Sequence, residues 1–281
     1  MPELPEAETI ARGLRGALLD QAIRDVHVVH PGIVVQPQEA FTAAIRHRVV
    51  VAVERRGKNV VLRLDDGSVI LINLGMTGSL LPFPSVPPEE TAPTHPTLVL
   101  HFDSGAVMVF DDTRRFGRAE WLTSRGWTER SALLGPEPLS ASFTARTLHA
   151  ALLASRAPAR SWLLDQRRVA GVGNIYANEA LFLAGVHPAR SARSISAEEA
   201  SALHRGLRSV LRKAIDQGGT TIRDYRNAEG EPGRYARRLL VYGREGRPCG
   251  RCGAPIRRIV FGGRSAFFCP QCQPGTADDA N

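Results

Sequence analysis

Short stretches in which apolar and polar residues alternate occupy much of the first half of the chain. The opening segment differs: Ile10, Leu14 and Leu18 recur four residues apart and Pro5 suits a first helical turn, which predicts an N-terminal helix. The alternating runs that follow are broken by Asp-Gly, Ser-Gly and proline-rich turns. They predict strands at 22–29, 45–54, 59–65, 68–74, 97–103, 106–111 and 118–122. Many short strands at this spacing predict a β-sandwich or a barrel.

The pattern takes a helical period after Gly126. Four stretches, 142–155, 159–168, 175–184 and 196–217, predict helices, whereas the polar, glycine-rich residues 218–238 predict a mobile loop. We therefore expect an α+β chain of two domains, the second ending in a small metal-bound hairpin. The expected boundaries are 1–132 for the β-rich domain, 133–141 for a linker, 142–238 for the helical domain, 239–273 for the cysteine module and 274–281 for a disordered tail.

Composition narrows the class of protein. A length of 281 residues is close to that at which one core stops growing, and 43% hydrophobic residues exclude wholesale disorder. No apolar run reaches the ~18 residues of a membrane helix. The start MPELPEAET lacks the basic and apolar pattern of a signal peptide. We expect a soluble, cytoplasmic protein without a membrane partner.

Charge is distributed unevenly along the chain. Residues 1–130 carry 14 Lys and Arg against 16 Asp and Glu, whereas residues 131–281 carry 22 against 12, so the net +8 comes from the second half. This asymmetry favours a polyanion partner, of which nucleic acid is the commonest. A preference for arginine as the solubilising charge explains it equally well. Only Lys58 and Lys213 are lysines, so these positions are candidates for a role that needs an amine.

The four cysteines predict a structural zinc site. Cys249 and Cys252 form one Cys-x2-Cys pair, and Cys269 and Cys272 form another 16 residues later, which is a four-cysteine zinc spacing. The strands expected between the pairs meet at Gly262-Gly263, which predicts a β-hairpin. Arg264 follows this turn, where it is either a phosphate ligand or an ordinary solvated residue.

Two further segments are candidates for chemistry. In VAGVGNIYANEA, 169–180, a glycine turn precedes Asn174 and a helical run, which predicts a helix capped by Asn174 and an anion site at its start. Ordinary helices also begin this way. At the N-terminus, removal of Met1 would expose the secondary amine of Pro2, a nucleophile of pKa near ~8, with Glu3 and Glu6 close by as proton carriers. A proline at a helix start explains the same residues without chemistry.

Taken together, these residues resemble the formamidopyrimidine-DNA glycosylase family, which is related to endonuclease VIII. The resemblance begins with PELPE at 2–6 and includes the four cysteines. The other matching motifs, in family order, are RRGK at 55–58, LGMTGSL at 74–80, RRFG at 114–117, LGPEPL at 134–139, GVGNIY at 171–176, GGTT at 218–221 and VYGR at 241–244. They span nearly the whole chain.

The resemblance implies a monomeric DNA glycosylase and AP lyase that excises oxidised purines opposite cytosine from double-stranded DNA. It implies an N-terminal helix and β-sandwich, then a helix–two-turn–helix domain with one structural zinc in a finger. Pro2 would attack C1′ of the damaged nucleotide, and Glu3 and Glu6 would assist. The residues implied to contact DNA are Lys58, Met76, His95, Arg114, Phe116, Asn174 and Arg264, while the loop 218–238 would close over the flipped base.

Two alternatives stay open. The endonuclease VIII branch performs the same chemistry on oxidised pyrimidines, but Leu4 stands where that branch typically has glycine. A zinc-containing DNA-binding protein without catalysis would most plausibly lack Pro2, Glu3 or Lys58. The chain departs from the family pattern at Thr113, usually proline, and at Thr97, often a second histidine, which affects fine contacts more than the nucleophile.

Overall fold

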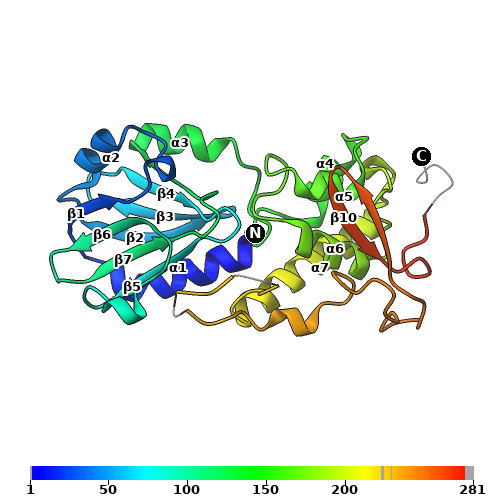
Figure 1. Ribbon diagram of the computed structural model, residues 1–281. Helices are drawn as coiled ribbons and strands as arrows, with labels where there is room; N and C mark the ends of the chain where they lie inside the picture. Colours follow the sequence, from blue (N-terminus) through cyan, green and yellow to red (C-terminus); the bar gives the residue numbers. More distant parts are fainter. Residues whose placement is uncertain (1, 223–224, 229, 276–281) are drawn as a thin grey trace. The chain divides into compact units, whose positions relative to one another are not determined.

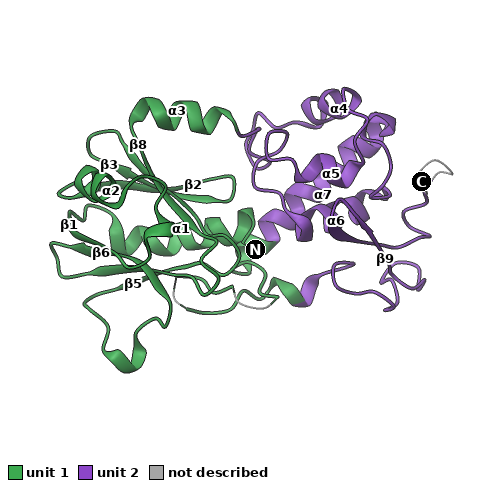
Figure 2. Cartoon of the chain, turned by 45° about the horizontal axis from the view of Figure 1, so that its top comes forward, with its two compact units in different colours: residues 1–133, 214–236 green, residues 134–213, 237–281 purple. Residues whose placement is uncertain are grey.

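The computed structural model of the chain describes residues 2–222, 225–228 and 230–275. The chain forms two compact units, each built from two stretches of sequence (Figure 2). The first comprises Met1–Leu133 and Ala214–Ala236, and the second comprises Leu134–Lys213 and Arg237–Asn281. Of the tail expected at 274–281, residues 276–281 lie outside the described residues. No described helix is long and apolar enough to cross a membrane.

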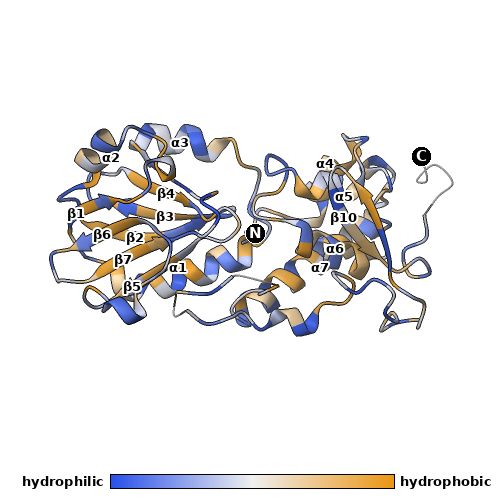
Figure 3. Ribbon diagram, in the orientation of Figure 1, coloured by the Kyte–Doolittle hydropathy of each residue, from blue (hydrophilic) through white to orange (hydrophobic). Residues whose placement is uncertain are grey.

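The first unit is a β-sandwich of two four-stranded antiparallel sheets (Figure 1). One sheet has the order β1 (Ile23–Val28), β6 (Pro96–Phe102), β7 (Val107–Asp111), β5 (Ser79–Phe83). The other has the order β2 (Val50–Arg56), β3 (Asn59–Leu64), β4 (Val69–Asn73), β8 (Arg118–Leu122). One apolar core takes alternate residues from both sheets, so the period of two in the sequence has its predicted structural meaning (Figure 3).

Helix α1 (Leu4–Leu18) closes this core. It packs against β2, β3 and β5, and Ile10, Leu14 and Leu18 are completely or almost completely buried, as their spacing predicted. Two further helices, α2 (Gln38–Ile45) and α3 (Ser124–Ala132), were absent from the sequence-based prediction. Each is only two to three turns long, which leaves little room for a periodic signal.

The segment 214–236 belongs to the first unit, although sequence analysis placed it in the helical domain. Tyr225 and Ala228 are buried in the sandwich core, and Thr220 is buried nearby. An isolated bridge pairs Thr220 with Arg234, which turns the segment back on itself. Apolar burial, which no local pattern reveals, decides the unit to which this irregular segment belongs.

The second unit consists of short helices and one hairpin. Its helices are α4 (Ala145–Leu153), α5 (Ala159–Leu164), α6 (Asn174–Ala184) and α7 (Ala197–Asp216), the last of which runs on into the first unit. The hairpin pairs β9 (Arg257–Phe261) with β10 (Arg264–Phe268), and Gly262 and Gly263 both have positive φ at its tip. The predicted α+β fold of two domains is confirmed.

A buried carboxylate on α6 binds the segment that precedes the zinc hairpin. Glu179 is fully buried, and its oxygens accept backbone N–H groups from Leu240, Val241 and Tyr242 at 2.8–2.9 Å. Burial raises the pKa of Glu179. Nothing in the local sequence pattern marks this glutamate, because its donors lie about sixty residues away.

Replacing Glu179 tests this anchor. Glu179→Ala leaves three N–H groups without their acceptor, at a cost of about 1–3 kcal/mol for each group that stays buried, so we expect the free energy of unfolding to fall by roughly 3 kcal/mol or more. Glu179→Gln keeps one oxygen as an acceptor, and its loss should be clearly smaller. Chemical denaturation of both variants measures the difference. Equal stability of wild type and the alanine variant would contradict the anchoring role.

Candidate functional site

Strand register gathers several turns at one end of the sandwich. Asn59 at the start of β3 pairs with Asn73 at the end of β4, which pairs with Arg118 at the start of β8. The turn that carries Lys58, between β2 and β3, therefore lies at the same end of the sheet as the β4–β5 turn and the β7–β8 loop. Side-chain hydrogen bonds also link these turns, because the Asn73 amide donates to Asn59 and accepts from the N–H of Gly75.

The start of α1 is directed to this end by an ion pair. Glu8 in the second turn of α1 bonds Arg55 near the end of β2 at 3.0 Å, and the exposed Arg12 at 2.7 Å. Burial alone would raise the pKa of Glu8, but the hydrogen bonds and charges of these two arginines hold it below its ordinary value. Arg55 precedes Lys58 by three residues, so the helix start and the lysine turn share one end of the unit.

Pro2, Glu3 and Glu6 are all buried at the start of α1. Glu3 caps the helix in a capping box with Glu6, and its N–H donates to Glu6 Oε2 at 2.8 Å. The other oxygen of Glu6, Oε1, accepts the N–H of Thr220 at 2.7 Å. One carboxylate therefore holds both the helix start and the turn at 218–221, next to Pro2.

This arrangement requires glycine at position 219. Gly219 has φ +88°, and a Cβ there would lie 2.9 Å from the Tyr225 ring and 3.1 Å from Glu6. The GGTT motif thus brings its backbone against a carboxylate of the N-terminal helix. Residues 218–222 and 225–228, expected in a mobile loop, include buried positions that contact Glu6 or pack in the sandwich core.

Three exposed side chains form a protruding group on the neighbouring turns. Met76, on the β4–β5 turn, is 40% exposed, and Phe116, on the β7–β8 loop, is 52% exposed. The guanidinium of Arg114 stacks 4.8 Å from the Phe116 ring centroid. Large exposed apolar side chains on two turns that touch each other are a candidate contact site for another molecule.

Asp112 holds this group together, and sequence analysis missed it. Its fully buried carboxylate accepts the Thr77 hydroxyl at 2.5 Å and the Gly117 N–H at 2.7 Å, and the N–H of Arg114 lies 3.1 Å from the same hydroxyl oxygen. A Cβ on Gly75 would lie 2.6 Å from the Gly117 backbone, so the two turns are in direct contact. Acidic residues beside arginines look like ordinary ion pairs in a sequence, which conceals this role.

His95 lies beside the same loop. It is exposed, its N–H donates to the carboxylate of Asp111 at 2.6 Å, and its carbonyl accepts the N–H of Asp112. Thr97, by contrast, is buried and bonds the Phe110 carbonyl, so this departure from the family pattern faces the core rather than the surface. Thr113, the other departure, is exposed.

In the second unit, Asn174 and the hairpin are joined by a buried arginine. Asn174 is the first residue of α6, and Gly173 rather than Asn174 is its N-cap, so the predicted capping role is wrong. The Asn174 amide instead accepts from Arg160 at 2.8 and 3.0 Å and donates to the Ser265 carbonyl at 3.0 Å. Within its own helix the Asn174 side chain accepts a hydrogen bond from the Asn178 amide at 3.1 Å, and its other partners lie outside α6.

Arg160 is 1% exposed and was also missed by sequence analysis. Besides Asn174, it bonds the carbonyls of Phe261 and Ser265 and stacks 4.9 Å from the Phe261 ring centroid. Burial and then the charge of Arg264 lower the pKa of Arg160. Arg264 itself is exposed at the first position of β10. Arg160 therefore joins the start of α6 to the hairpin tip, where Arg264 is exposed.

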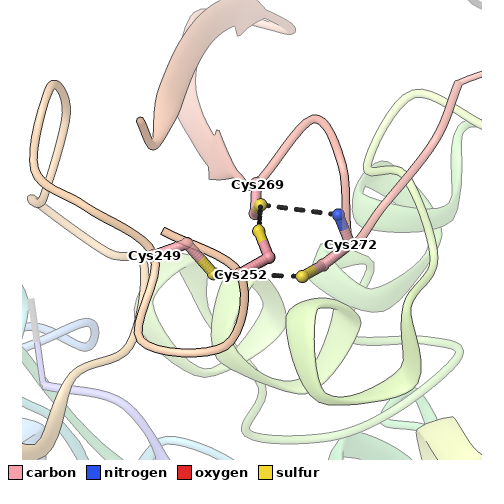
Figure 4. A group of neighbouring side chains, drawn as sticks. All are labelled: Cys249, Cys252, Cys269 and Cys272. Atoms are coloured by element: carbon pink, nitrogen blue, oxygen red, sulfur yellow. Dashed lines mark hydrogen bonds between the residues drawn. The ribbon is translucent and has the colours of Figure 1, made fainter. Parts of the chain in front are cut away.

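The four cysteines meet at the base of the hairpin (Figure 4). All four sulfurs lie within 4.8 Å of one another, with Cys249 and Cys272 at 3.9 Å and Cys252 and Cys269 at 3.4 Å. Tetrahedral zinc with Zn–S bonds of ~2.3 Å requires sulfur separations of about 3.8 Å. Four thiolates complete the coordination of one zinc ion and leave no open position, so this donor set fits a structural ion.

Three family models match the chain in order. They are the formamidopyrimidine-DNA glycosylase N-terminal domain over residues 1–119, the formamidopyrimidine-DNA glycosylase H2TH domain over 134–226, and the zinc finger found in FPG and IleRS over 246–275. A glycosylase domain followed by a helix–two-turn–helix domain and a zinc finger defines a class of DNA glycosylase.

Whole-chain relatives identify the family. The formamidopyrimidine-DNA glycosylase of Chloroflexus aggregans is 43% identical over 97% of this chain and 98% of its own. A Lactococcus lactis Fpg bound to DNA with an abasic site has a TM-score of 0.89 and 31% identity, covering 97% of this chain and 100% of that one. A MutM in complex with DNA containing carbocyclic 8-oxo-G has a TM-score of 0.89 and 31% identity, with 98% and 100% covered. The chain belongs to the formamidopyrimidine-DNA glycosylase family, whose members act in base excision repair.

Loss of one zinc ligand tests the metal site. The four cysteines hold one structural zinc ion, so metal analysis of the wild type should give one zinc per chain. Cys269→Ser should release it, because three thiolates hold the ion far more weakly, and backbone exchange over 257–268 should then accelerate by at least about tenfold. Exchange in α1 should not change. Zinc-free protein with wild-type protection of the hairpin would contradict a structural role.

Proposed function

We propose that this chain is a bifunctional DNA glycosylase and AP lyase that excises oxidised purines, 8-oxoguanine and formamidopyrimidines, opposite cytosine. The observation that carries the proposal is the position of Pro2 beside the buried carboxylates of Glu3 and Glu6 at the start of α1. Removal of Met1 makes Pro2 a secondary amine of pKa near ~8, so a useful fraction is unprotonated at neutral pH. Carboxylates at hydrogen-bonding distance from the same helix start are suited to move protons.

The chemistry follows from these groups. The Pro2 nitrogen forms a bond to C1′ as the bond from C1′ to the damaged base breaks. The base leaves with the bonding electron pair and takes up a proton from water, while the nitrogen passes its own proton to the Glu3 carboxylate. Glu3 delivers a proton to the ring oxygen O4′, the sugar opens, and the nitrogen lone pair completes a cationic iminium. Loss of a C2′ proton then expels the 3′ phosphate, and a second elimination expels the 5′ phosphate. The expected product is a one-nucleotide gap with phosphate on both sides.

Residues of both units suit the handling of DNA. Lys58 carries an amine on the turn near the helix start, where it suits a phosphate next to the lesion. Met76 and Phe116 have the size and exposure to fill the space of a flipped base, and Arg114 has donors for an orphaned cytosine. In the second unit, Arg264 and the second amide hydrogen of Asn174 suit backbone phosphates, because Ser265 engages only one of the two.

Structures of relatives with DNA support this assignment. One of these relatives binds DNA that contains an abasic site, and another binds DNA that contains carbocyclic 8-oxo-G. Leu4, fully buried in the first turn of α1, favours the purine branch, since the pyrimidine branch typically has glycine there.

Covalent trapping tests the nucleophile. Borohydride should reduce the iminium and trap an enzyme–DNA adduct through Pro2, and Pro2→Gly should weaken trapping strongly while keeping an N-terminal amine. A variant that retains Met1 should lose lyase activity with DNA affinity nearly unchanged, because the amine is then blocked. Mass spectrometry of the adduct locates the bond. Equal trapping by the extended variant would assign the nucleophile to a lysine, Lys58 or Lys213, instead of Pro2.

Opposite-base preference tests the substrate assignment. Wild type should excise 8-oxoguanine faster opposite cytosine than opposite adenine, because adenine presents a donor edge to Arg114 and the mismatch costs about 1–3 kcal/mol, or roughly 5- to 150-fold. Arg114→Ala should flatten this preference in single-turnover assays. Lys58→Ala serves as the control because it also removes one positive charge, and it should weaken DNA binding with every opposite base. Faster removal of thymine glycol than of 8-oxoguanine would favour the pyrimidine branch.

A further inference from the structure

Helix α7 carries a row of cations that the proposed excision site does not use. Arg205, Arg208 and Arg212 follow one another at helical spacing, and at about 100° per residue they lie within an arc of about 60°. Lys213, one of the two lysines of the chain, follows Arg212 and lies about 80° outside this arc. The opposite face of the helix is buried, with Leu203, Leu207 and Val210 in the core of the second unit.

The side chains of this row are presented to solvent. Arg205, Arg212 and Lys213 are exposed and Arg208 is half-buried. Together with His204 and Ser209 they line a hollow of about 370 Å³ on the second unit. At about 30 Å³ per water, the hollow has room for a hydrated phosphate group.

No carboxylate pairs with this row in the part of the chain that the structure describes. None of its four cations forms an ion pair. Asp216 lies one turn beyond Arg212 on the same helix, yet no ion pair joins them. Burial and then the nearby charge of Arg212 lower the pKa of Arg208. Like charges held this close favour an anion from outside the chain.

The folded chain also fixes one of these charges in place. The guanidinium of Arg208 donates from Nη1 to the carbonyls of Pro138 and Ser140, both at 2.8 Å, which leaves its Nε and Nη2 donors directed elsewhere. Arg205 donates to the Ser201 hydroxyl at 2.7 Å, one turn earlier. Side chains held in this way lose less conformational entropy when they bind an anion.

We propose that this face, Arg205, Arg208, Arg212 and Lys213, binds consecutive backbone phosphates of duplex DNA away from the lesion. The inference rests on the proposed function, because that function supplies DNA as the polyanion. Arg205 and Lys213 are eight positions apart, about 12 Å along the helix axis, so the four cations lie ~4 Å apart on average, close to the ~3.4 Å between successive phosphates of one DNA strand along the duplex axis. No Phe, Tyr or Trp side chain is among the residues that line the hollow, and its one ring, His204, already contacts the Phe143 ring and carbonyl, which favours backbone phosphates over stacked bases.

Salt-dependent binding to undamaged duplex is the test. The double variant Arg205→Ala/Arg212→Ala should reduce the slope of log affinity against log salt by about 1.8, at ~0.9 for each lost phosphate contact, and weaken affinity roughly 10- to 60-fold at ~0.1 M salt. Alanine is a strong helix former, so α7 should persist, which an unchanged melting temperature and zinc content verify. Arg156→Ala/Arg193→Ala, which removes two exposed arginines of the same unit that form no ion pair, should change the slope far less.

A second readout separates this face from the excision site. At saturating enzyme, the α7 double variant should excise the lesion at the wild-type single-turnover rate. A lower rate at saturation would overturn the proposal by placing these arginines in the excision site. A duplex affinity and salt slope equal to those of the control pair would also overturn it, and would favour an acidic protein segment as the occupant. If the proposed function itself were wrong, the wild type would show no borohydride adduct. That outcome is distinct from both results above.

Discussion

Buried carboxylates that hold two segments together are the interaction on which both candidate sites depend. Glu6 joins the start of α1 to the turn at 218–221, and Asp112 joins the turn of Met76 to the loop of Arg114 and Phe116. Glu179 holds the segment before the zinc module against α6. Buried donors that lose such an acceptor cost about 1–3 kcal/mol each, so these segments do not separate without a large loss of stability. A few oxygen atoms thus set the geometry of many surface side chains.

The second unit uses a cation in the same way. The guanidinium of Arg160 donates hydrogen bonds to Asn174 and to two carbonyls of the hairpin, and so connects the start of α6 to the zinc module. A planar fork of five donors can bond several acceptors at once, whereas an ammonium presents a single point of charge. Zinc fixes one end of the hairpin and Arg160 fixes the other, so Arg264 is presented on a rigid support.

The positions and partners of the arginines show why net charge alone does not define a binding surface. Arg160 is buried, Arg190 pairs with Glu199, and Arg251 stacks on the Phe182 ring. These residues contribute to the excess charge of the second half, yet they are occupied inside the protein. The cations of α7 and Arg264 remain at the surface. Which arginines meet an external anion is therefore decided by what packs around each of them.

Sequence by itself determined the features that arise from local spacing. The recurrence of Ile10, Leu14 and Leu18 fixes α1, the alternation of apolar residues marks the strands, and two Cys-x2-Cys pairs with Gly262-Gly263 between them fix the zinc hairpin. Each of these signals lies within some twenty residues, where backbone geometry converts sequence spacing directly into position. The motifs also identified the family, since they occur in its order along nearly the whole chain.

Only the tertiary structure decided how distant segments meet. Residues 214–236 belong to the first unit because Tyr225 and Ala228 bury apolar surface in the sandwich core. Asn174 bonds Arg160 rather than capping its helix, and Asp112 and Glu179 act through partners tens of residues away. Such partners leave no periodic trace in the sequence, because a hydrogen bond between remote residues depends on where the whole chain has packed. The burial of apolar surface decides that packing, and the polar contacts of the candidate sites follow from it.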